Sequence, residues 1–332
     1  MGAGGGTPGR AEGDHRTAPP EGPSVSDRRD HLDALAIGLL LTCCALWGFN
    51  QVAMKLALAE IPPLMQAAAR SAGAALLLAA WSRARGLPIW RADGTAAAGW
   101  LAGALFAAEF GMMFVGLQYT TASRMVVFLY LAPFVVALGM PLIAPSERLD
   151  AWQTLGLVGA FCGVVWAFAE GLGRPSAGPH QWLGDALGLG AAVLWGLTTL
   201  VLRGSRLATA LPEKTLLYQL AVSALALGSA SLLAGEPWPA SVGARSIAAL
   251  GFQTVVVTFA SYLAWFWLVR HYPATRISAF TLLTPVFGLL AGVGLLGEPI
   301  TLRIVVALVA VSCGIALVNR TRRGPTTQEK TR

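Results

Sequence analysis

Apolar segments of nearly membrane-spanning length recur along the whole chain, and they restrict its fold more than any other feature. A helix needs about 20 apolar residues to cross a ~30 Å hydrocarbon core. The segments are far longer than the ~10 residues of a membrane barrel strand, and they lack its alternating pattern. They predict an all-α polytopic membrane protein with about ten transmembrane helices, at 34–58, 63–81, 97–118, 121–143, 151–170, 182–202, 215–234, 246–269, 275–296 and 301–318.

Composition and charge distribution agree with this fold class. Of the 332 residues, 55% are apolar and 12% are charged, about half the ~25% charged content of soluble domains. With the N-terminus in the cytoplasm, about 18 Lys and Arg residues lie inside and about 5 outside, which is a strong positive-inside signal. The net charge of +7 is therefore a topology signal and does not indicate nucleic-acid binding. We expect a multi-pass protein of the cytoplasmic membrane with both termini in the cytoplasm.

Several short motifs occur twice, about 150 residues apart, which is the spacing of a whole-domain repeat. Trp47-Gly48 returns as Trp195-Gly196, Pro133 returns as Pro285, and Glu147-Arg148-Leu149 returns as Glu298-Pro299-Ile300. Five crossings per copy place the second copy upside-down relative to the first, as in many secondary transporters. The sequence thus predicts two inverted five-helix repeats, with a tail at 1–32, a first repeat at 33–170, a linker at 171–181, a second repeat at 182–320 and a tail at 321–332.

Two charged side chains stand out inside the predicted spans, Arg70 and Glu109. Each would cost at least ~2.5–3.5 kcal/mol on insertion scales, so each needs a reason. At 1.5 Å per residue both lie roughly 10–13 Å deep, and Asn50 and Gln51 of the first span come out in the same layer, on the helical face of Trp47. In a structural interpretation, Arg70 and Glu109 form a permanent ion pair. In a functional interpretation, Glu109 carries a coupling proton and Arg70 binds an anionic group of a substrate.

The second half offers polar and aromatic residues but fewer charges. Hydroxyl and aromatic side chains recur at helical spacing in the eighth and ninth spans, as Thr254, Thr258, Ser261, Tyr262, Trp265, Ser278, Thr281 and Thr284, with Tyr218 and Gln219 in the seventh. Each alone is explained by hydrogen bonding between helices, whereas together they favour the wall of a cavity for an amphipathic metabolite. The candidate substrate-binding residues are Trp47, Asn50, Gln51, Arg70, Tyr130, Tyr218, Tyr262, Trp265 and Thr284.

Pro133 and Pro285 occupy matching positions within the fourth and ninth spans. A proline inside a helix removes one backbone hydrogen bond and disrupts the preceding turn. Both residues are explained either as kinks that help packing or as a pair of hinges beside a central cavity.

The ordered motifs resemble the drug/metabolite transporter superfamily, and within it the EamA-type transporters. The residues that carry the resemblance are Trp47-Gly48-Phe49-Asn50, Tyr119-Thr-Thr-Ala-Ser-Arg124, Tyr130-Leu-Ala-Pro133, Glu147-Arg148-Leu149, Trp195-Gly196, Ala274-Thr-Arg276, Thr284-Pro285 and Gly297-Glu298-Pro299-Ile300. The resemblance covers about residues 34–320. It implies a ten-helix carrier of the inner membrane, often an exporter of amino acids or other metabolites.

The leading hypothesis is a secondary active transporter that moves a small metabolite by alternating access, in the direction of efflux and driven by protons or by exchange. A lipid flippase or multidrug exporter of the same superfamily is the alternative, and a membrane receptor or enzyme is a remote one. No phosphate-binding loop, nucleophile–base pair or metal-ligand spacing is found, so we expect a non-enzymatic protein without cofactor or metal. Expected partners are a small-molecule substrate, a coupling proton and the bilayer, and not nucleic acid.

Overall fold

The computed structural model describes residues 2, 33–143, 150–173, 175–272, 280–281 and 283–318. Most of both predicted tails, the Glu147-Arg148-Leu149 motif, Ala274-Thr-Arg276 and Ser278 lie outside the described residues. The helices are α1 (Ala34–Ala57), α2 (Pro63–Ala84), α3 (Ala96–Gly116), α4 (Ala122–Leu129), α5 (Ala132–Ile143), α6 (Ala151–Gly173), α7 (Gln181–Gly204), η2 (Arg206–Thr209), α8 (Pro212–Leu233), α9 (Ala244–Gly251), η3 (Phe252–Ser261), α10 (Tyr262–His271), α12 (Leu283–Leu296) and α13 (Leu302–Val318).

The described part of the chain is helical, and the predicted all-α membrane fold is confirmed. Within the described residues, seven helical segments are long and apolar enough to cross a membrane, and two shorter apolar helices, Leu283–Leu296 and Leu302–Leu317, follow them. The 22 residues of α2 match a further predicted span. Polar residues buried on its inner face, among them Gln66 and Arg70, lower its hydropathy.

The fourth predicted span is broken in the middle. Helix α4 ends at Leu129, Tyr130 and Leu131 lie in a turn, and α5 begins at Ala132. The ring of Pro133 would clash with the carbonyl four residues earlier, which is that of Leu129. Pro133 therefore accounts for the break. Its counterpart Pro285 is the third residue of α12, and residues 273–279 and 282 ahead of it are not described.

The eighth predicted span is not the single α-helix that its spacing suggested. Between α9 and α10, the ten residues of η3 form a π-helix, a conformation that is rare and frequent at functional sites. Within this wider turn, Thr254 donates to the carbonyl of Leu250 and Thr258 to the carbonyl of Gln253. Both hydroxyls therefore donate to carbonyls of their own helical segment. They are not available to line a cavity, which is the role that their helical spacing suggested.

The two halves pack against each other reciprocally. Helix α1 packs on α12 and α7 on α5 and α4, while α3 packs on α7 and α1 on the segment from α9 to α10. When each helix is replaced by its counterpart in the other half, the α1–α12 pair becomes the pair of α7 with α5 and α4. The α3–α7 pair becomes the pair of α1 with the segment from α9 to α10. Two further pairs, α3 with α8 and η3 with α2, are exchanged in the same way, while α2 with α8, α6 with α13, and α4 with α12 of the fourth and ninth spans join counterparts directly. This pattern is that of two five-helix repeats related by a pseudo-twofold axis.

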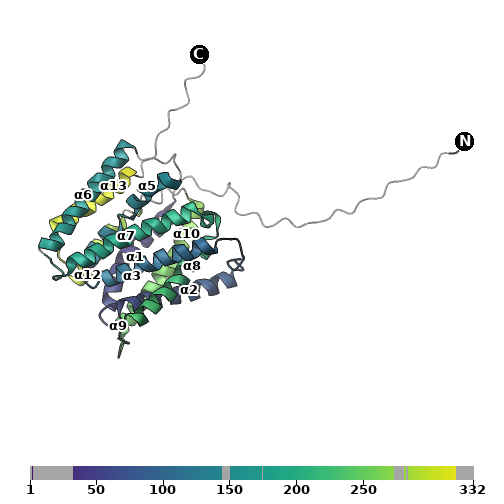
Figure 1. The fold of residues 1–332 in the computed structure, drawn as a ribbon, viewed down its shortest axis with the longest axis horizontal. Helices are drawn as coiled ribbons and strands as arrows, with labels where there is room; N and C mark the ends of the chain where they lie inside the picture. Colours follow the sequence, from purple (N-terminus) through teal and green to yellow (C-terminus); the bar gives the residue numbers. More distant parts are fainter. Residues whose placement is uncertain are drawn as a thin grey trace, which may run out of the picture.

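Figure 1 shows the resulting interleaving: helices α7, α3, α8 and α2 lie side by side, and they come alternately from the second and first halves. Because neighbouring helices in this layer come from different halves, the boundary between the halves runs through the middle of the bundle.

The repeated Trp-Gly motif has the same packing role in each half. A Cβ on Gly48 would lie 2.8 Å from the carbonyl oxygen of Thr284, and one on Gly196 would lie 3.1 Å from that of Ala132. Each of these carbonyls belongs to the residue directly before the repeated proline, Pro285 or Pro133. The missing side chain lets the helices approach closely, so each glycine holds the first helix of one half against the proline-containing helix of the other.

Candidate functional site

Arg70 lies in the interior of the bundle with an unusual set of neighbours. Its side chain is 1% exposed, and its guanidinium lies 3.9 Å from the ring centroid of Phe110 and 5.5 Å from that of Phe114, both on α3. Its Nε and Nη2 atoms have no hydrogen-bond partner among the described residues. The aromatic faces stabilise the cation but leave its directed N–H donors free to bind another group.

Glu109, on α3 beside Phe110, is 4% exposed, and its Oε2 atom also has no hydrogen-bond partner among the described residues. Arg70 and Glu109 are close enough to interact electrostatically. No ion pair within 4.0 Å joins them, however, in the described part of the chain. The structure therefore places a basic and an acidic side chain in one region without the direct contact of a permanent ion pair.

Tyr262, the first residue of α10, brings the second half into this region. It lies within electrostatic range of both Arg70 and Glu109. Its ring makes an edge contact with Trp47 at 6.3 Å, and Trp47 makes another with Trp265 at 5.3 Å. The Trp47 indole N–H donates to Ser261 Oγ at 2.8 Å, which fixes the orientation of this aromatic wall.

Tyr130 and Thr284 form the adjoining part of the site, where the break between α4 and α5 meets the start of α12. Both are buried. Tyr130 lies close to Thr284, Cys44 and Tyr262, and its ring contacts Trp195 at 5.9 Å. We call Trp47, Arg70, Glu109, Tyr130, Tyr262, Trp265 and Thr284 the central site.

Three predicted site residues have different surroundings. The Asn50 amide donates to Met54 on the same helix, and the Gln51 amide donates to Met113, one turn from Glu109 on α3. Both side chains are buried, and their carbonyl oxygens have no partner among the described residues. Tyr218 packs on Gly99 of α3, near Lys214. The structure therefore brings Gln51 to the edge of the central site and gives Tyr218 a role in helix packing.

Sequence reasoning missed a second charged cluster at one face of the bundle. Arg124, at the start of α4, contacts Asp185 of α7 at 2.6 Å and Glu170 of α6 at 3.0 Å, and it donates to the Ala167 carbonyl. Thr120 donates to Asp185 as well. Arg124, Glu170 and Asp185 all lie within the predicted spans, so counting every charge inside a span would have found them.

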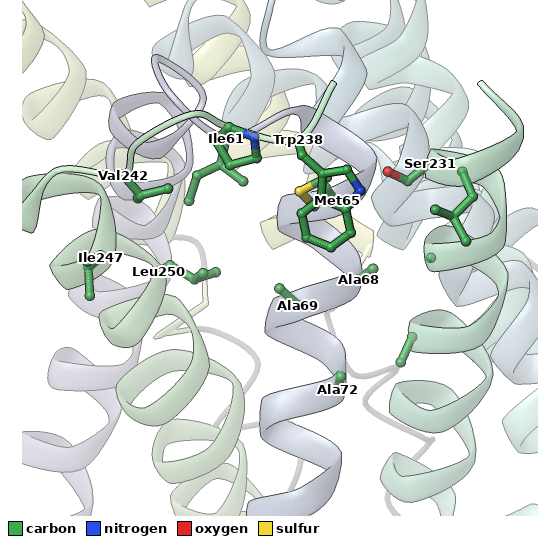
Figure 2. Close-up of a pocket in the computed structure, with 14 residues that line it drawn as sticks. Ile61, Met65, Ala68, Ala69, Ala72, Ser231, Trp238, Val242, Ile247 and Leu250 are labelled. Carbon is green, nitrogen blue, oxygen red and sulfur yellow. The ribbon is translucent and has the colours of Figure 1, made fainter. Parts of the chain in front are cut away.

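An apolar groove of about 580 Å³ lies apart from the central site, between α2, α8 and α9. Figure 2 shows Ala68, Ala69 and Ala72 of α2 at its centre, with Leu250 of α9 on one side and Ser231 of α8 on the other. Ser231 is the one hydroxyl in its lining, and that hydroxyl already donates to Glu236. Apart from Ser231 and the indole N–H of Trp238 the lining side chains are apolar, so the groove suits a hydrocarbon chain better than a hydrophilic solute.

Comparison with known proteins identifies the architecture. A family model described as the EamA-like transporter family matches residues 34–169 and 182–320, once in each half. The chain belongs to the EamA-like transporter family. It is therefore a multi-pass membrane transporter, and the resemblance inferred from the repeated motifs is confirmed.

Known proteins from other organisms match over most of the chain. The uncharacterized transporter YvbV of Bacillus subtilis (strain 168) is 29% identical over 85% of this chain and 90% of its own length. The uncharacterized protein PA1977 of Pseudomonas aeruginosa is 30% identical over 88% of this chain and 97% of its own. A solved structure titled "Crystal structure of protein" has a TM-score of 0.60 at 19% identity, and it covers 86% of this chain and 97% of its own, which supports the fold alone.

Proposed function

We propose that this protein is a secondary active transporter that carries a small zwitterionic or amphipathic metabolite across the cytoplasmic membrane by alternating access. Both termini are placed in the cytoplasm by the charge distribution, and export is the direction that the family resemblance implies. The central site lies between the two halves, where alternating access requires the substrate to bind.

The observation that carries this proposal is the separation of two buried ionisable side chains, one basic and one acidic. Arg70 and Glu109 each keep polar atoms without a protein partner, and an unpaired charge in a membrane interior is costly unless it serves a function. A substrate with an acidic and a basic group satisfies both, because its carboxylate accepts from Arg70 and its ammonium group donates to Glu109. The rings of Trp47, Tyr262 and Trp265 supply the apolar wall for the rest of such a molecule.

A screen of the purified full-length protein tests this assignment. Amino acids, nucleosides, sugars and cationic drugs are compared by thermal shift, since a bound ligand raises apparent stability by mass action. We expect zwitterions to stabilise the protein and Arg70→Met to abolish the shift. Arg303→Met provides a matched control, because Arg303 lies on α13 against Trp166. A wild-type shift with sugars or nucleosides, but none with zwitterions, would contradict the proposed substrate class.

The coupling role of Glu109 is tested by flux. In proteoliposomes with an imposed pH gradient, wild-type uptake of the identified ligand should depend on the gradient, and Glu109→Gln should keep exchange while losing that dependence. Glu213→Gln, a carboxylate in the first turn of α8, is the control. Gradient-driven transport that persists in Glu109→Gln assigns coupling to another group.

The groove in Figure 2 favours a second candidate, a lipid flippase, because a flippase needs an apolar path that opens between helices. Ala69→Trp would fill this groove from an exposed position on α2. Under the leading proposal, this variant transports the small solute normally. Under the flippase proposal, the wild type moves a fluorescent phospholipid between leaflets and Ala69→Trp blocks that movement.

A further inference from the structure

The tripeptide Gly-Glu-Pro occurs twice in the second half, directly after a helix each time. Gly235-Glu236-Pro237 follows α8 and Gly297-Glu298-Pro299 follows α12. Both glycines have a φ of +66°, the left-handed conformation that ends helices. The chain therefore leaves both helices through a left-handed glycine, and a glutamate follows that glycine each time.

Glu298 uses this position to cap a helix of the other half. Its two carboxylate oxygens accept from the backbone N–H groups of Ala122 at 2.7 Å and Ser123 at 2.9 Å, which are the first residues of α4. The Ser123 hydroxyl donates to it at 2.6 Å, and Lys55 Nζ lies 3.8 Å away. The carboxylate is 8% exposed, so these contacts replace most of its hydration.

Glu236 repeats the arrangement at another helix. Its oxygens accept from the N–H groups of Leu64 at 3.0 Å and Met65 at 2.9 Å in the first turn of α2, while the Ser231 hydroxyl supports it at 2.7 Å. Helix N-termini leave such N–H groups without partners and favour negative charge. The same chemistry thus joins α8 of the second half to α2 of the first.

Glu60 makes the reciprocal connection from the first half. It follows α1 and accepts from the N–H of Gly243 at 2.7 Å, at the N-cap of α9. Its contacts with Gly243 and Ser246 hold the pKa of Glu60 below its ordinary value. All three carboxylates lie on the face where α1, α8 and α12 end and α2, α4 and α9 begin, which we call the carboxylate face.

We propose that Glu60, Glu236 and Glu298 form a three-point latch that holds the two halves together at the carboxylate face and releases when the central site opens there. Each contact crosses from one half to the other, so no opening between the halves at this face can leave all of them intact. The inference rests on the proposed alternating-access function. The charge distribution that places the termini in the cytoplasm makes this face the outer one.

Helix capping is suited to a latch because it is strong in one geometry and lost over a small displacement. Movement of α4 by a few ångströms breaks both backbone contacts of Glu298 together, and water then solvates the carboxylate and the N–H groups separately. The latch is therefore reversible. Its strength depends on carboxylates outside the central site, so it can be changed without touching the substrate-binding residues.

Pulsed electron spin resonance distances test the latch without any substrate. Spin labels at Gln118 and Ile300, exposed positions at the carboxylate face in the first and second half, report separation of the halves there. The background is the full-length protein with its four cysteines replaced by serine. We expect one short distance in this background and an added, longer population in Glu298→Ala, increasing when Glu236→Ala is combined with it.

Glu213→Ala, which removes a carboxylate from the opposite end of α8, should leave this distance unchanged. If Glu298→Ala fails to fold, the exposed Glu60→Ala and the milder Glu236→Gln carry the test. A distance unchanged in every folded latch variant would overturn the inference. If the Gln118–Ile300 distance lengthens in the latch variants but the protein transports no solute, the latch is supported and the proposed function is rejected. Failure of the latch and failure of the proposed function are therefore distinguishable.

Discussion

The two faces of the bundle join the same two halves with different chemistry. At the carboxylate face, three glutamates cap helices and Arg124 binds Asp185 and Glu170 in a buried network. At the opposite face, where α2 and α7 end, Lys214 of the second half bridges Asp93 at 2.8 Å and the Arg91 carbonyl at 2.6 Å in the first. Carboxylates on backbone N–H groups thus join the halves at the carboxylate face, whereas at the opposite face the Lys214 ammonium group joins them.

One pair of corresponding positions shows how the difference arises. Helix α2 ends in Gly86-Leu87-Pro88 and α8 in Gly235-Glu236-Pro237. The two glycines have φ angles of +65° and +66°, and the next N–H groups donate to the carbonyls of Ser82 and Ser231. The Ser231 hydroxyl binds Glu236, whereas the buried Ser82 hydroxyl has no partner among the described residues. The two repeats thus share the backbone conformation of this turn, and they differ in the side chain that follows the glycine, Leu87 or Glu236.

This difference has a consequence for a transporter. If both faces closed with identical contacts, symmetry would make the two open states equal in energy. The equivalent turn at the opposite face carries Leu87 where the carboxylate face has Glu236, so the opposite face has one cap fewer. Under the proposed alternating access, this difference favours opening at the opposite face. In the proposed orientation the opposite face is the cytoplasmic one, and the absence of this carboxylate agrees with the basic character that the positive-inside rule requires there.

The largest effect should come from the Arg124 network. Arg124→Met leaves the fully buried Asp185 carboxylate without its cation, and breaking a buried pair in this way costs about 3–5 kcal/mol. Lys214→Met at the opposite face should cost less, about 0–1 kcal/mol, because the side chain of Asp93 is 39% exposed and stays solvated. Thermal unfolding in one detergent checks both. Equal losses would contradict the comparison of the two faces.

The next-largest effect is expected at Gly48 and Gly196, the glycines of the Trp-Gly motif, which pack in the same way in both halves. A Cβ on Gly48 would lie 2.6 Å from the backbone nitrogen of Gly288, and one on Gly196 would lie 2.5 Å from the Cβ of Val135. Gly48→Ala and Gly196→Ala should each destabilise the protein by about 1–3 kcal/mol through overpacking. Gly159→Ala, which meets open space, is the matched control in the same unfolding assay. A loss at one glycine only would show that the packing is not reciprocal.

Sequence alone predicted the parts of this fold that depend on periodicity. The lengths of the apolar segments, the Trp-Gly repeat and Pro133 gave the helices, the two halves and the position of the break before α5. The π-helix from Phe252 to Ser261 was not predictable in this way, because a π-turn depends on which backbone carbonyls find partners and not on hydrophobic spacing.

The central site was predictable in its charges but not in their relationship. Depth along the helices put Arg70 and Glu109 in one layer, yet depth does not fix rotation about each helix axis. Side-chain packing decides that Arg70 contacts Phe110 and leaves Glu109 unpaired. For the same reason it was not predictable that Glu236 and Glu298 reach α2 and α4, since these contacts depend on how the two halves lie against each other.

An exchange of side chains between the two equivalent turns sharpens the comparison. Glu236→Leu removes a cap worth about 0.5–2 kcal/mol, so the ratio of open to closed carboxylate face should rise about 2- to 30-fold. Leu87→Glu should place a carboxylate beside Ser82 and the start of α8, and should favour closure of the opposite face. The Gln118–Ile300 distance, with a second label pair at Trp90 and Thr209 on the opposite face, measures both. Glu236→Leu should lengthen the Gln118–Ile300 distance, and Leu87→Glu should shorten the Trp90–Thr209 distance. The assignment is refuted if both distances lengthen or both shorten.

The smallest expected effect is that of pH on the opposite face. Hydrogen bonds from Lys214 and Thr95 hold the pKa of Asp93 at about 2, below its ordinary value of 3.8. An acid whose pKa is lowered by folding contributes stability that is complete above its unfolded pKa and is lost as pH falls through the folded value. The Asp93–Lys214 pair should therefore stay intact from about pH 8 to about pH 5, and the Trp90–Thr209 distance should not change over that range. Asp93→Asn should lengthen that distance at every pH in the range, since it removes the charge without a titration. A midpoint between about pH 5 and about pH 8 in the wild type would instead mean that another titrating group, and not Asp93, closes this face.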